Sequence, residues 1–280
     1  MIAVVLALMA ALAYGTSDFA GGLASRRFAA GPVTAVIEAV GLLTAAAAVV
    51  LFPGGGPSAT VLAWGAVSGV GTAVGALSLY HGLSVGRMSI VATLSAVLTA
   101  VIPVIVGVAL GNHLSVGAEA GIAIAFPAIG LMSWQRQAND RHAARAGVLY
   151  GVLAGLGFAL LFIALDRAGT SAGAWPLIPG QLVGVLLVAP FAYRGLSASG
   201  APPRSAVALT LGAGVLSGIA NLLFLAATGR GELAIVAVLT SLYPAATVVL
   251  ARAFLAERWT GVQAAGLLTS AAAIILVSTG

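Results

Sequence analysis

Residues 88–110 read MSIVATLSAVLTAVIPVIVGVAL, an uncharged apolar run that is long enough to cross a lipid bilayer as one helix. Residues 233–255, which read LAIVAVLTSLYPAATVVLARAFL, are similar to them. Sliding the sequence by 145 positions aligns residues 86–133 with residues 231–278 without a gap, and 14 of these 48 positions are identical. A match of this length predicts that the chain consists of two similar halves.

Apolar stretches of similar length recur along the whole chain, and polar or turn-forming residues separate them. A helix needs about 20 apolar residues to cross the hydrocarbon layer. The sequence predicts an all-α membrane protein with ten transmembrane helices, at roughly residues 1–23, 33–52, 60–82, 88–110, 116–134, 147–166, 174–192, 205–228, 233–255 and 260–279. The longest polar break, residues 135–145, predicts a linker between one five-helix repeat, residues 1–134, and a second, residues 146–280.

The composition excludes a soluble globular fold. Of the 280 residues, 61% are hydrophobic and 7% are charged, and the mean hydropathy is +1.13. Soluble domains carry about 25% charged residues because their surfaces face water, so lipid must be the solvent for most of this chain. The net charge of +5 comes from dispersed arginines, which argues against a nucleic-acid surface, and the absence of cysteine excludes disulfides and thiolate metal sites.

Five helices in each repeat would give the two halves opposite orientations, because an odd number of crossings ends on the other side of the membrane. The sequence therefore predicts two inverted five-helix repeats. Inverted repeats place a binding site near the midplane and permit alternating access to the two faces. The predicted architecture therefore favours a transport function.

Glycine spacing predicts where helices meet. Gly71 and Gly75 lie four residues apart in the third predicted helix, and Gly151 and Gly155 repeat this spacing in the sixth. Helices in lipid associate by close backbone approach, so these faces are expected to form helix–helix contacts within a compact bundle.

The last two predicted helices resemble a known family. Residues 245–278 read AATVVLARAFLAERWTGVQAAGLLTSAAAIILVS and follow Leu242-Tyr243-Pro244. They resemble the closing helix pair of the EamA-domain transporters of the drug/metabolite transporter superfamily, in which a proline in the ninth helix precedes a Glu-Arg turn and a Gln-x-x-Gly helix. The residues that match are Pro244, Glu257, Gln263 and Gly266, and Ala13-Tyr14-Gly15 resembles the aromatic-glycine opening of the family.

The resemblance implies ten helices, a central cavity formed by both halves, and movement of metabolites, amino acids or drugs, often outward. The first half departs from the family pattern at two positions. Asn112 stands where the family usually has glutamate, and Thr99 stands where it usually has proline, although Pro103 lies one turn later.

Ionisable residues inside the predicted spans are the first candidates for function, since a charge at the bilayer centre costs at least about 2.5–3.5 kcal/mol. Asp18 and Glu38 each lie about five residues from the loop between the first two helices, so roughly 7–8 Å below that surface. Tyr14 lies one turn deeper on the face of Asp18. We expect these carboxylates to line a vestibule or to exchange protons against substrate; the alternative is pairing with Arg26 or Arg27 for assembly alone.

His81 falls on the same side as these carboxylates, where it would neutralise one of them or extend to interfacial water. Neutral polar groups deeper inside the spans are candidates for a substrate pocket, or for hydrogen bonds between helices. They are Ser95 and Thr99 in the fourth predicted helix, Gln181 in the seventh, Asn221 in the eighth, and Thr240 and Tyr243 in the ninth.

No motif predicts a cofactor or a metal, because the Gly-x-Gly patterns lie inside apolar helices and no His/Glu cluster has ligand spacing. We therefore predict a secondary transporter of a small metabolite, amino acid or drug in the plasma or inner membrane, with protons as a candidate coupling ion. Two alternatives remain. One is an intramembrane enzyme acting on lipid, with His81, Asp18 and Glu38 as its reactive cluster, and the other is a structural or regulatory membrane subunit.

Arginine placement bears on orientation. Nine of the twelve arginines fall in loops after odd-numbered predicted helices, and two fall in the other loops. The positive-inside rule then places the odd-numbered loops in the cytoplasm and both termini outside, whereas the resemblance implies cytoplasmic termini. Both arguments place the two termini on one side.

Overall fold

The computed structural model describes residues 1–51, 54–85, 88–132, 141–199, 201–255 and 260–279, and these residues are almost entirely helical. The helices are α1 (Ile2–Ser25), α2 (Ala30–Leu51), α3 (Ala59–Val85), α4 (Met88–Ala109), α5 (Val116–Met132), α6 (Arg141–Ala168), α7 (Leu177–Ser199), α8 (Arg204–Thr228), α9 (Leu233–Thr240), α10 (Pro244–Leu255) and α11 (Gly261–Thr279). Seven of them are long and apolar enough to cross a membrane, and three further apolar segments are shorter: residues 116–131, 233–247 and 261–277.

The helix boundaries differ from the sequence prediction, most clearly in the second half of the chain. The span predicted at residues 233–255 is interrupted, since α9 ends at Thr240 and α10 begins at Pro244. Proline lacks the N–H that would continue the helix, and its ring clashes with the carbonyl four residues earlier. Furthermore, α6 begins at Arg141, inside the predicted linker, and α7 begins at Leu177 and continues to Ser199.

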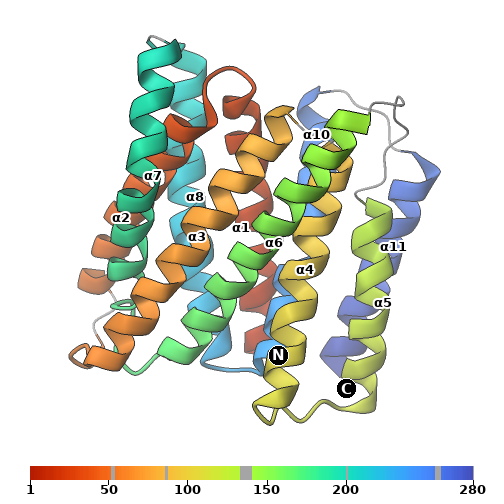
Figure 1. Cartoon of the computed structure of the whole chain (residues 1–280). Coiled ribbons are helices and arrows are strands. Elements are labelled where there is room, and N and C mark those ends of the chain that lie inside the picture. Colours follow the sequence, from red (N-terminus) through yellow and green to blue (C-terminus); the bar gives the residue numbers. More distant parts are fainter. Residues whose placement is uncertain (52–53, 86–87, 133–140, 200, 256–259, 280) are drawn as a thin grey trace.

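The helices run roughly side by side, and both chain termini lie at the same end of the bundle (Figure 1). The closest pairings join helices that are far apart in the sequence. They are α3 with α6 and α7, α1 with α8, α9 and α10, α4 with α6 and α9, α2 with α7 and α8, and α5 with α11. In Figure 1, α5 and α11 form one edge of the bundle and α2 and α7 form the other.

Glycines allow the helix backbones to approach closely at the positions that the spacing predicts. A Cβ on Gly71 would lie 2.6 Å from the carbonyl oxygen of Gly157 in α6, and one on Gly75 would lie 2.6 Å from the Phe158 ring. Gly151 and Gly155 likewise face α4, at Leu94 and Leu98. These contacts confirm that the small-residue faces are helix–helix interfaces.

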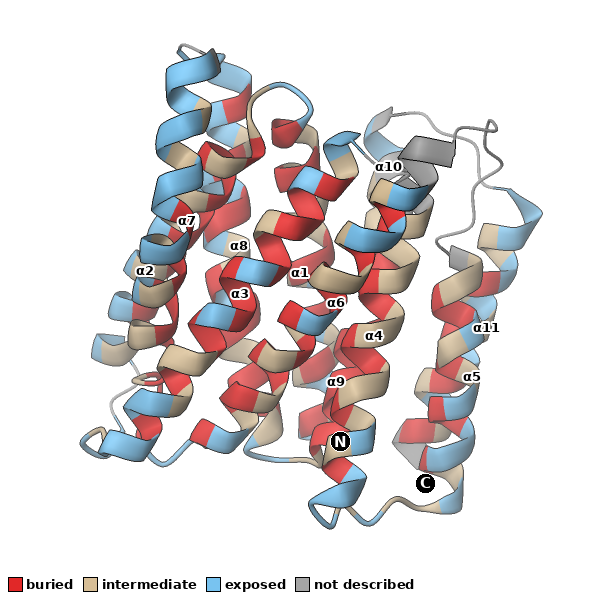
Figure 2. Cartoon of the chain, viewed as in Figure 1, coloured by how far each residue is buried: buried red, intermediate tan, exposed pale blue. Residues whose placement is uncertain are grey.

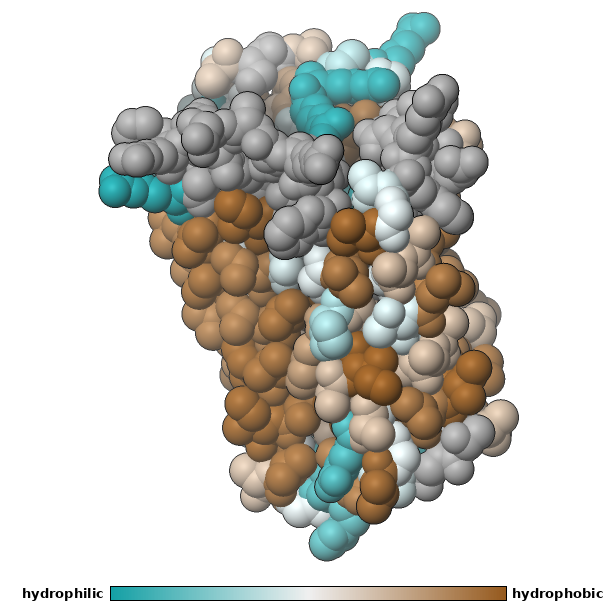
Figure 3. All heavy atoms as spheres, turned by 90° about the vertical axis from the view of Figure 1, so that its right-hand side faces the viewer, coloured by the Kyte–Doolittle hydropathy of each residue, from teal (hydrophilic) through white to brown (hydrophobic). Residues whose placement is uncertain are grey.

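Buried residues line the inward faces of the helices, and the exposed residues lie on the outer faces and at the ends (Figure 2). Many exposed side chains are large and apolar, among them Leu268 (75% exposed) and Leu43 (70%). On the face shown in Figure 3, hydrophobic residues dominate the middle, and the strongly hydrophilic ones gather towards the two ends. This distribution is that of a helical bundle surrounded by lipid.

Candidate functional site

The interruption between α9 and α10 lies in the interior of the bundle, where residues 236–244 are buried. The chain crosses it through Ser241, Leu242 and Tyr243. Tighter hydrogen bonds replace the regular ones here, from Leu242 N to Leu239 O (3.3 Å) and from Tyr243 N to Thr240 O (3.2 Å). Proline at position 244 explains this local unwinding, and its counterpart in α4 is Thr99, through which that helix continues unbroken.

Polar groups of α4, α9 and α1 surround the interruption. The hydroxyls of Tyr243 and Ser95 lie 3.4 Å apart, and Thr240 Oγ1 donates to Ala7 O in α1 (3.4 Å). Thr99 does not reach across, because its Oγ1 donates to Ser95 O within α4 (2.7 Å). Ser241 is fully buried, and its Oγ has no hydrogen-bond partner among the described residues.

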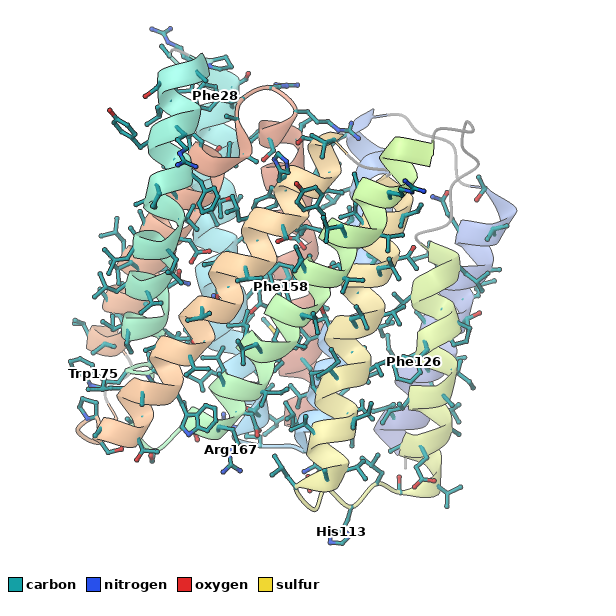
Figure 4. All side chains as sticks on the ribbon, viewed as in Figure 1. Phe28, His113, Phe126, Phe158, Arg167 and Trp175 are labelled. Carbon is teal, nitrogen blue, oxygen red and sulfur yellow. The ribbon has the colours of Figure 1, made fainter. Side chains whose placement is uncertain are left out.

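Aromatic rings of α1, α6 and α8 belong to the same buried core as Leu242 and Tyr243 of the interruption. The ring of Tyr14 lies 5.9 Å from that of Phe162, which stacks on Phe224 at 4.0 Å. Phe158, one turn before Phe162 in α6, lies near the middle of the bundle in Figure 4. The sequence does not single out these phenylalanines, because a phenylalanine inside an apolar helix carries no signal that separates a lining residue from ordinary packing.

A continuous chain of side-chain hydrogen bonds runs from Tyr14 to Glu38, and all four of its members are buried. The Tyr14 hydroxyl donates to Asn221 Oδ1. The neighbours of Gln181 determine the orientation of its amide, because in only one orientation does the amide nitrogen face acceptors and the amide oxygen face a donor. In that orientation Asn221 Nδ2 donates to Gln181 Oε1 (3.0 Å), and Gln181 Nε2 donates to Glu38 Oε2 (2.6 Å). The chain thus joins α1, α8, α7 and α2.

Asp18 lies outside this chain. It is half-buried, and the Tyr80 hydroxyl of α3 donates to its Oδ1 at 3.4 Å. The preceding residue, Ser17, is buried and donates to Ala213 O of α8 (2.8 Å). Asp18 is also close enough to Tyr14 and Tyr243 to interact with both electrostatically.

Both carboxylates lie deeper than the sequence suggested. Because α1 continues to Ser25 and α2 already begins at Ala30, Asp18 and Glu38 are seven and eight residues from the near helix ends. This corresponds to about 10–12 Å along the helix, where the sequence analysis placed them at 7–8 Å. The error arose because the connection between the two helices is shorter than predicted.

The remaining candidates are distributed as follows. Tyr14, Glu38, Gln181 and Asn221 meet in the hydrogen-bonded chain, while Ser95, Thr240 and Tyr243 meet at the helix interruption. His81 joins neither group, since it is exposed and its ring packs edge-on against Tyr150 at 4.8 Å. The structure therefore does not assemble His81, Asp18 and Glu38 into one reactive cluster.

Two features fall partly or wholly outside the described residues: Glu257 of the family turn, and most of the predicted linker at residues 135–145. Asn112, the counterpart of Glu257, is described. Its Oδ1 accepts a hydrogen bond from Ala234 N (3.2 Å), so the connection between α4 and α5 contacts the first turn of α9. Within the described part of the chain, no group of three or more His, Cys, Asp or Glu side chains could hold a metal.

Apolar helices around a buried, hydrogen-bonded polar interior define a multi-pass helical membrane protein. Residues 145–279 match the model of the EamA-like transporter family. One solved structure, described only as a crystal structure of a protein, has the same fold with a TM-score of 0.76 at 17% identity, over 99% of this chain and 96% of that one. No curated protein matches the chain. The second half of the chain is thus similar to the EamA-like transporter family, and the whole chain shares its fold with the solved structure.

Proposed function

We propose that the protein is a secondary carrier that moves a small polar or amphipathic metabolite, amino acid or drug across the plasma or inner membrane by alternating access. The observation that carries the proposal is the interruption between α9 and α10, which is buried beside Ser95 in the same core as the aromatic rings. Transporters build substrate sites at such discontinuous helices, because the unwound backbone and its side chains offer polar groups inside the membrane.

The proposed architecture is ten crossings in two inverted repeats, residues 1–134 and 146–280, with α9 and α10 forming one crossing. The packing supports it. The equivalent helices of the two halves are α1 and α6, α2 and α7, α3 and α8, α4 and α9, and α5 and α11. When each helix is replaced by its equivalent, the α3–α6 pair becomes the α8–α1 pair, and the α3–α7 pair becomes the α8–α2 pair. Three further pairs each join a helix to its own equivalent and are unchanged by the replacement: α2–α7, α4–α9 and α5–α11. Such symmetry provides two related states that open to opposite faces.

The proposed substrate site lies where α1, α4, α6, α8 and the interruption meet. Tyr14, Phe162, Phe224 and Tyr243 would supply aromatic surface, and Ser95 would supply a hydroxyl. A site with these groups suits a small molecule that has both an apolar part and hydrogen-bonding groups.

The proposed coupling ion is the proton, held by Glu38 or Asp18. Glu38 is 2% exposed, and the side chain that bonds to it is a neutral amide. A carboxylate so placed within the membrane is costly unless it has a function, and proton exchange is the function that suits a secondary carrier.

Transport in proteoliposomes with an imposed pH gradient tests the proposal. A thermal-shift screen of the purified protein against amino acids, sugars, nucleotides and cationic drugs identifies candidate substrates. A ligand that binds only the folded state raises the stability of the protein. Glu38→Gln and Asp18→Asn are then compared with Glu119→Gln, which neutralises an exposed carboxylate in the first turn of α5.

We expect pH-driven transport to be lost in at least one of the two interior variants and retained in Glu119→Gln. If both interior variants transport normally, the coupling assignment is wrong. If no ligand class stabilises the protein and none is transported, the carrier proposal fails and the alternative of a structural membrane subunit gains support.

A further inference from the structure

Glu38 and Gln181 occupy matching positions in two crossing helices. Each begins a segment with glycine three residues later, Glu38-x-x-Gly41 in α2 and Gln181-x-x-Gly184 in α7. The packing is reciprocal: a Cβ on Gly184 would lie 2.6 Å from Glu38 Oε2, and a Cβ on Gly41 would lie 2.9 Å from Gln181 Cδ. Each polar side chain thus fills the space above the other helix's glycine, which holds the carboxylate and the amide against each other.

The hydrogen bonds that extend from this pair all point in one direction. With Glu38 ionised, Gln181 donates to the carboxylate, Asn221 donates to Gln181, and the Tyr14 hydroxyl donates to Asn221. A carboxylate only accepts hydrogen bonds, whereas a side-chain amide has a donating end and an accepting end. Ionised Glu38, together with its backbone oxygen, which also accepts from Gln181 Nε2 (3.3 Å), therefore determines which end of each amide faces which neighbour.

Protonation of Glu38 permits the reverse order. A carboxylic acid has an O–H that can donate to Gln181 Oε1. When it does, the amide turns, gives up the 3.3 Å hydrogen bond from Nε2 to the Glu38 backbone oxygen and presents Nε2 to Asn221. Asn221 must then accept through Oδ1 and present Nδ2 to Tyr14. The Tyr14 oxygen becomes an acceptor, and its own proton becomes available to another group in the centre of the bundle.

We propose that Gln181 and Asn221 form a reversible hydrogen-bond relay that carries the protonation state of Glu38 to the hydroxyl of Tyr14. If the protein is a carrier, as proposed above, a substrate that offers an oxygen acceptor to Tyr14 binds more tightly when Glu38 is protonated. Linkage then requires that this substrate in turn favours protonation of Glu38, which couples the two without direct contact.

Other groups near Glu38 come from the helices packed against α2. Tyr14 on α1 and Tyr80 on α3 are close enough to interact with it electrostatically, and Asp18 on α1 faces both tyrosines. On α7 and α8 the facing groups are the neutral amides, since Arg194 and Arg204 lie near the ends of those helices. Asp18 can titrate as well, so Asp18→Asn is included as a background in which only Glu38 responds.

Infrared difference spectroscopy of the purified full-length protein tests the relay without any substrate. The pH is changed between about 4 and 10, which spans the range of an ordinary to a strongly shifted carboxyl group. We expect a carboxylic acid band that disappears in Glu38→Gln, together with a shift of a tyrosine C–O band. The chain has five tyrosines, so the difference between the spectra of the parent protein and Tyr14→Phe assigns this band.

Breaking the relay must separate the two signals. In Asn221→Leu the Glu38 band should remain, and the response of Tyr14 should be lost. Gln181→Met breaks the neighbouring link and serves if Asn221→Leu does not fold. Thr210→Val is the matched control, because among the described residues this buried hydroxyl of α8 bonds only to Ala206 O of its own helix (2.7 Å), and both signals should survive in it.

The relay is refuted if no Glu38 band occurs in this pH range, if Tyr14 does not respond in the parent protein, or if its response survives Asn221→Leu or Gln181→Met. These results do not depend on transport. A protein with an intact relay that moves no substrate would refute the carrier proposal alone, and a proton-coupled carrier whose Tyr14 ignores Glu38 would refute the relay alone.

Discussion

Glu38 is a buried carboxylate with little space around it. Gly184 faces its Oε2, so α7 approaches the carboxylate closely. Gly184→Ala should displace Glu38 and lower the free energy of unfolding by about 1–3 kcal/mol, which is the usual cost of overpacking. Thermal unfolding in detergent measures this. Gly212→Ala in α8 is the control, because nothing lies within 4 Å of its Cβ position, and equal effects of the two substitutions would contradict the prediction.

Asn112 links one half of the chain to a helix of the other. Its Oδ1 accepts from Ala234 N in the first turn of α9, whose N-cap residue, Glu232, makes no side-chain cap bond. Asn112→Ala should destabilise the protein by about 0.5–2 kcal/mol, the usual value of a helix cap. Asn112→Asp keeps the acceptor and should retain most of the stability, while His113→Ala, at an exposed neighbour, should have little effect. A loss of stability in Asn112→Asp as large as that in Asn112→Ala would argue against capping.

At the scale of the helices, the interruption between α9 and α10 depends on Pro244. Pro244→Ala restores an N–H and removes the ring clash, so α9 and α10 should join into one helix. One additional hydrogen bond stabilises the fold by about 0.5–1.5 kcal/mol, while Tyr243 should turn away from Ser95 and transport should fall. Unfolding and transport assays on the same preparation measure both effects. Unchanged transport in a stabilised variant would show that the interruption is not needed for function.

At the scale of the whole molecule, the bundle predicts which connections share a side of the membrane. Phe28 lies at one end of the bundle, and His113, Arg167 and Trp175 lie at the other, where both termini are also found (Figure 4). The chain has no cysteine, so Phe28→Cys and His113→Cys are unique sites for a membrane-impermeant maleimide. We expect opposite-sided labelling, with Cys at 113 on the side of the terminal tags. Same-sided labelling of the two positions would overturn the proposed ten-crossing topology.

The sequence by itself determined the solvent of this protein and its division into helices. Hydrophobic run length and sparse charge are local properties, because a helix in lipid must satisfy its backbone internally whatever it packs against. Glycine spacing likewise predicted the close contacts of α3 and α6, since close approach depends on small side chains. Pro244 could have predicted the interruption of the ninth span. The prediction was based on the length of the apolar run, and because this run continues through Pro244, its length alone does not reveal a break.

Only the tertiary structure decided which polar groups meet. Tyr14, Glu38, Gln181 and Asn221 were each recognisable as polar residues inside a span, but nothing in the sequence joined them. In a helix that is apolar on nearly every side, the hydrophobic pattern does not set the rotation about the axis, so the facing partners follow from packing between helices. The same packing set the contact of Asn112 with α9 and left His81 outside the polar interior, because those contacts join segments that only the folded bundle brings together.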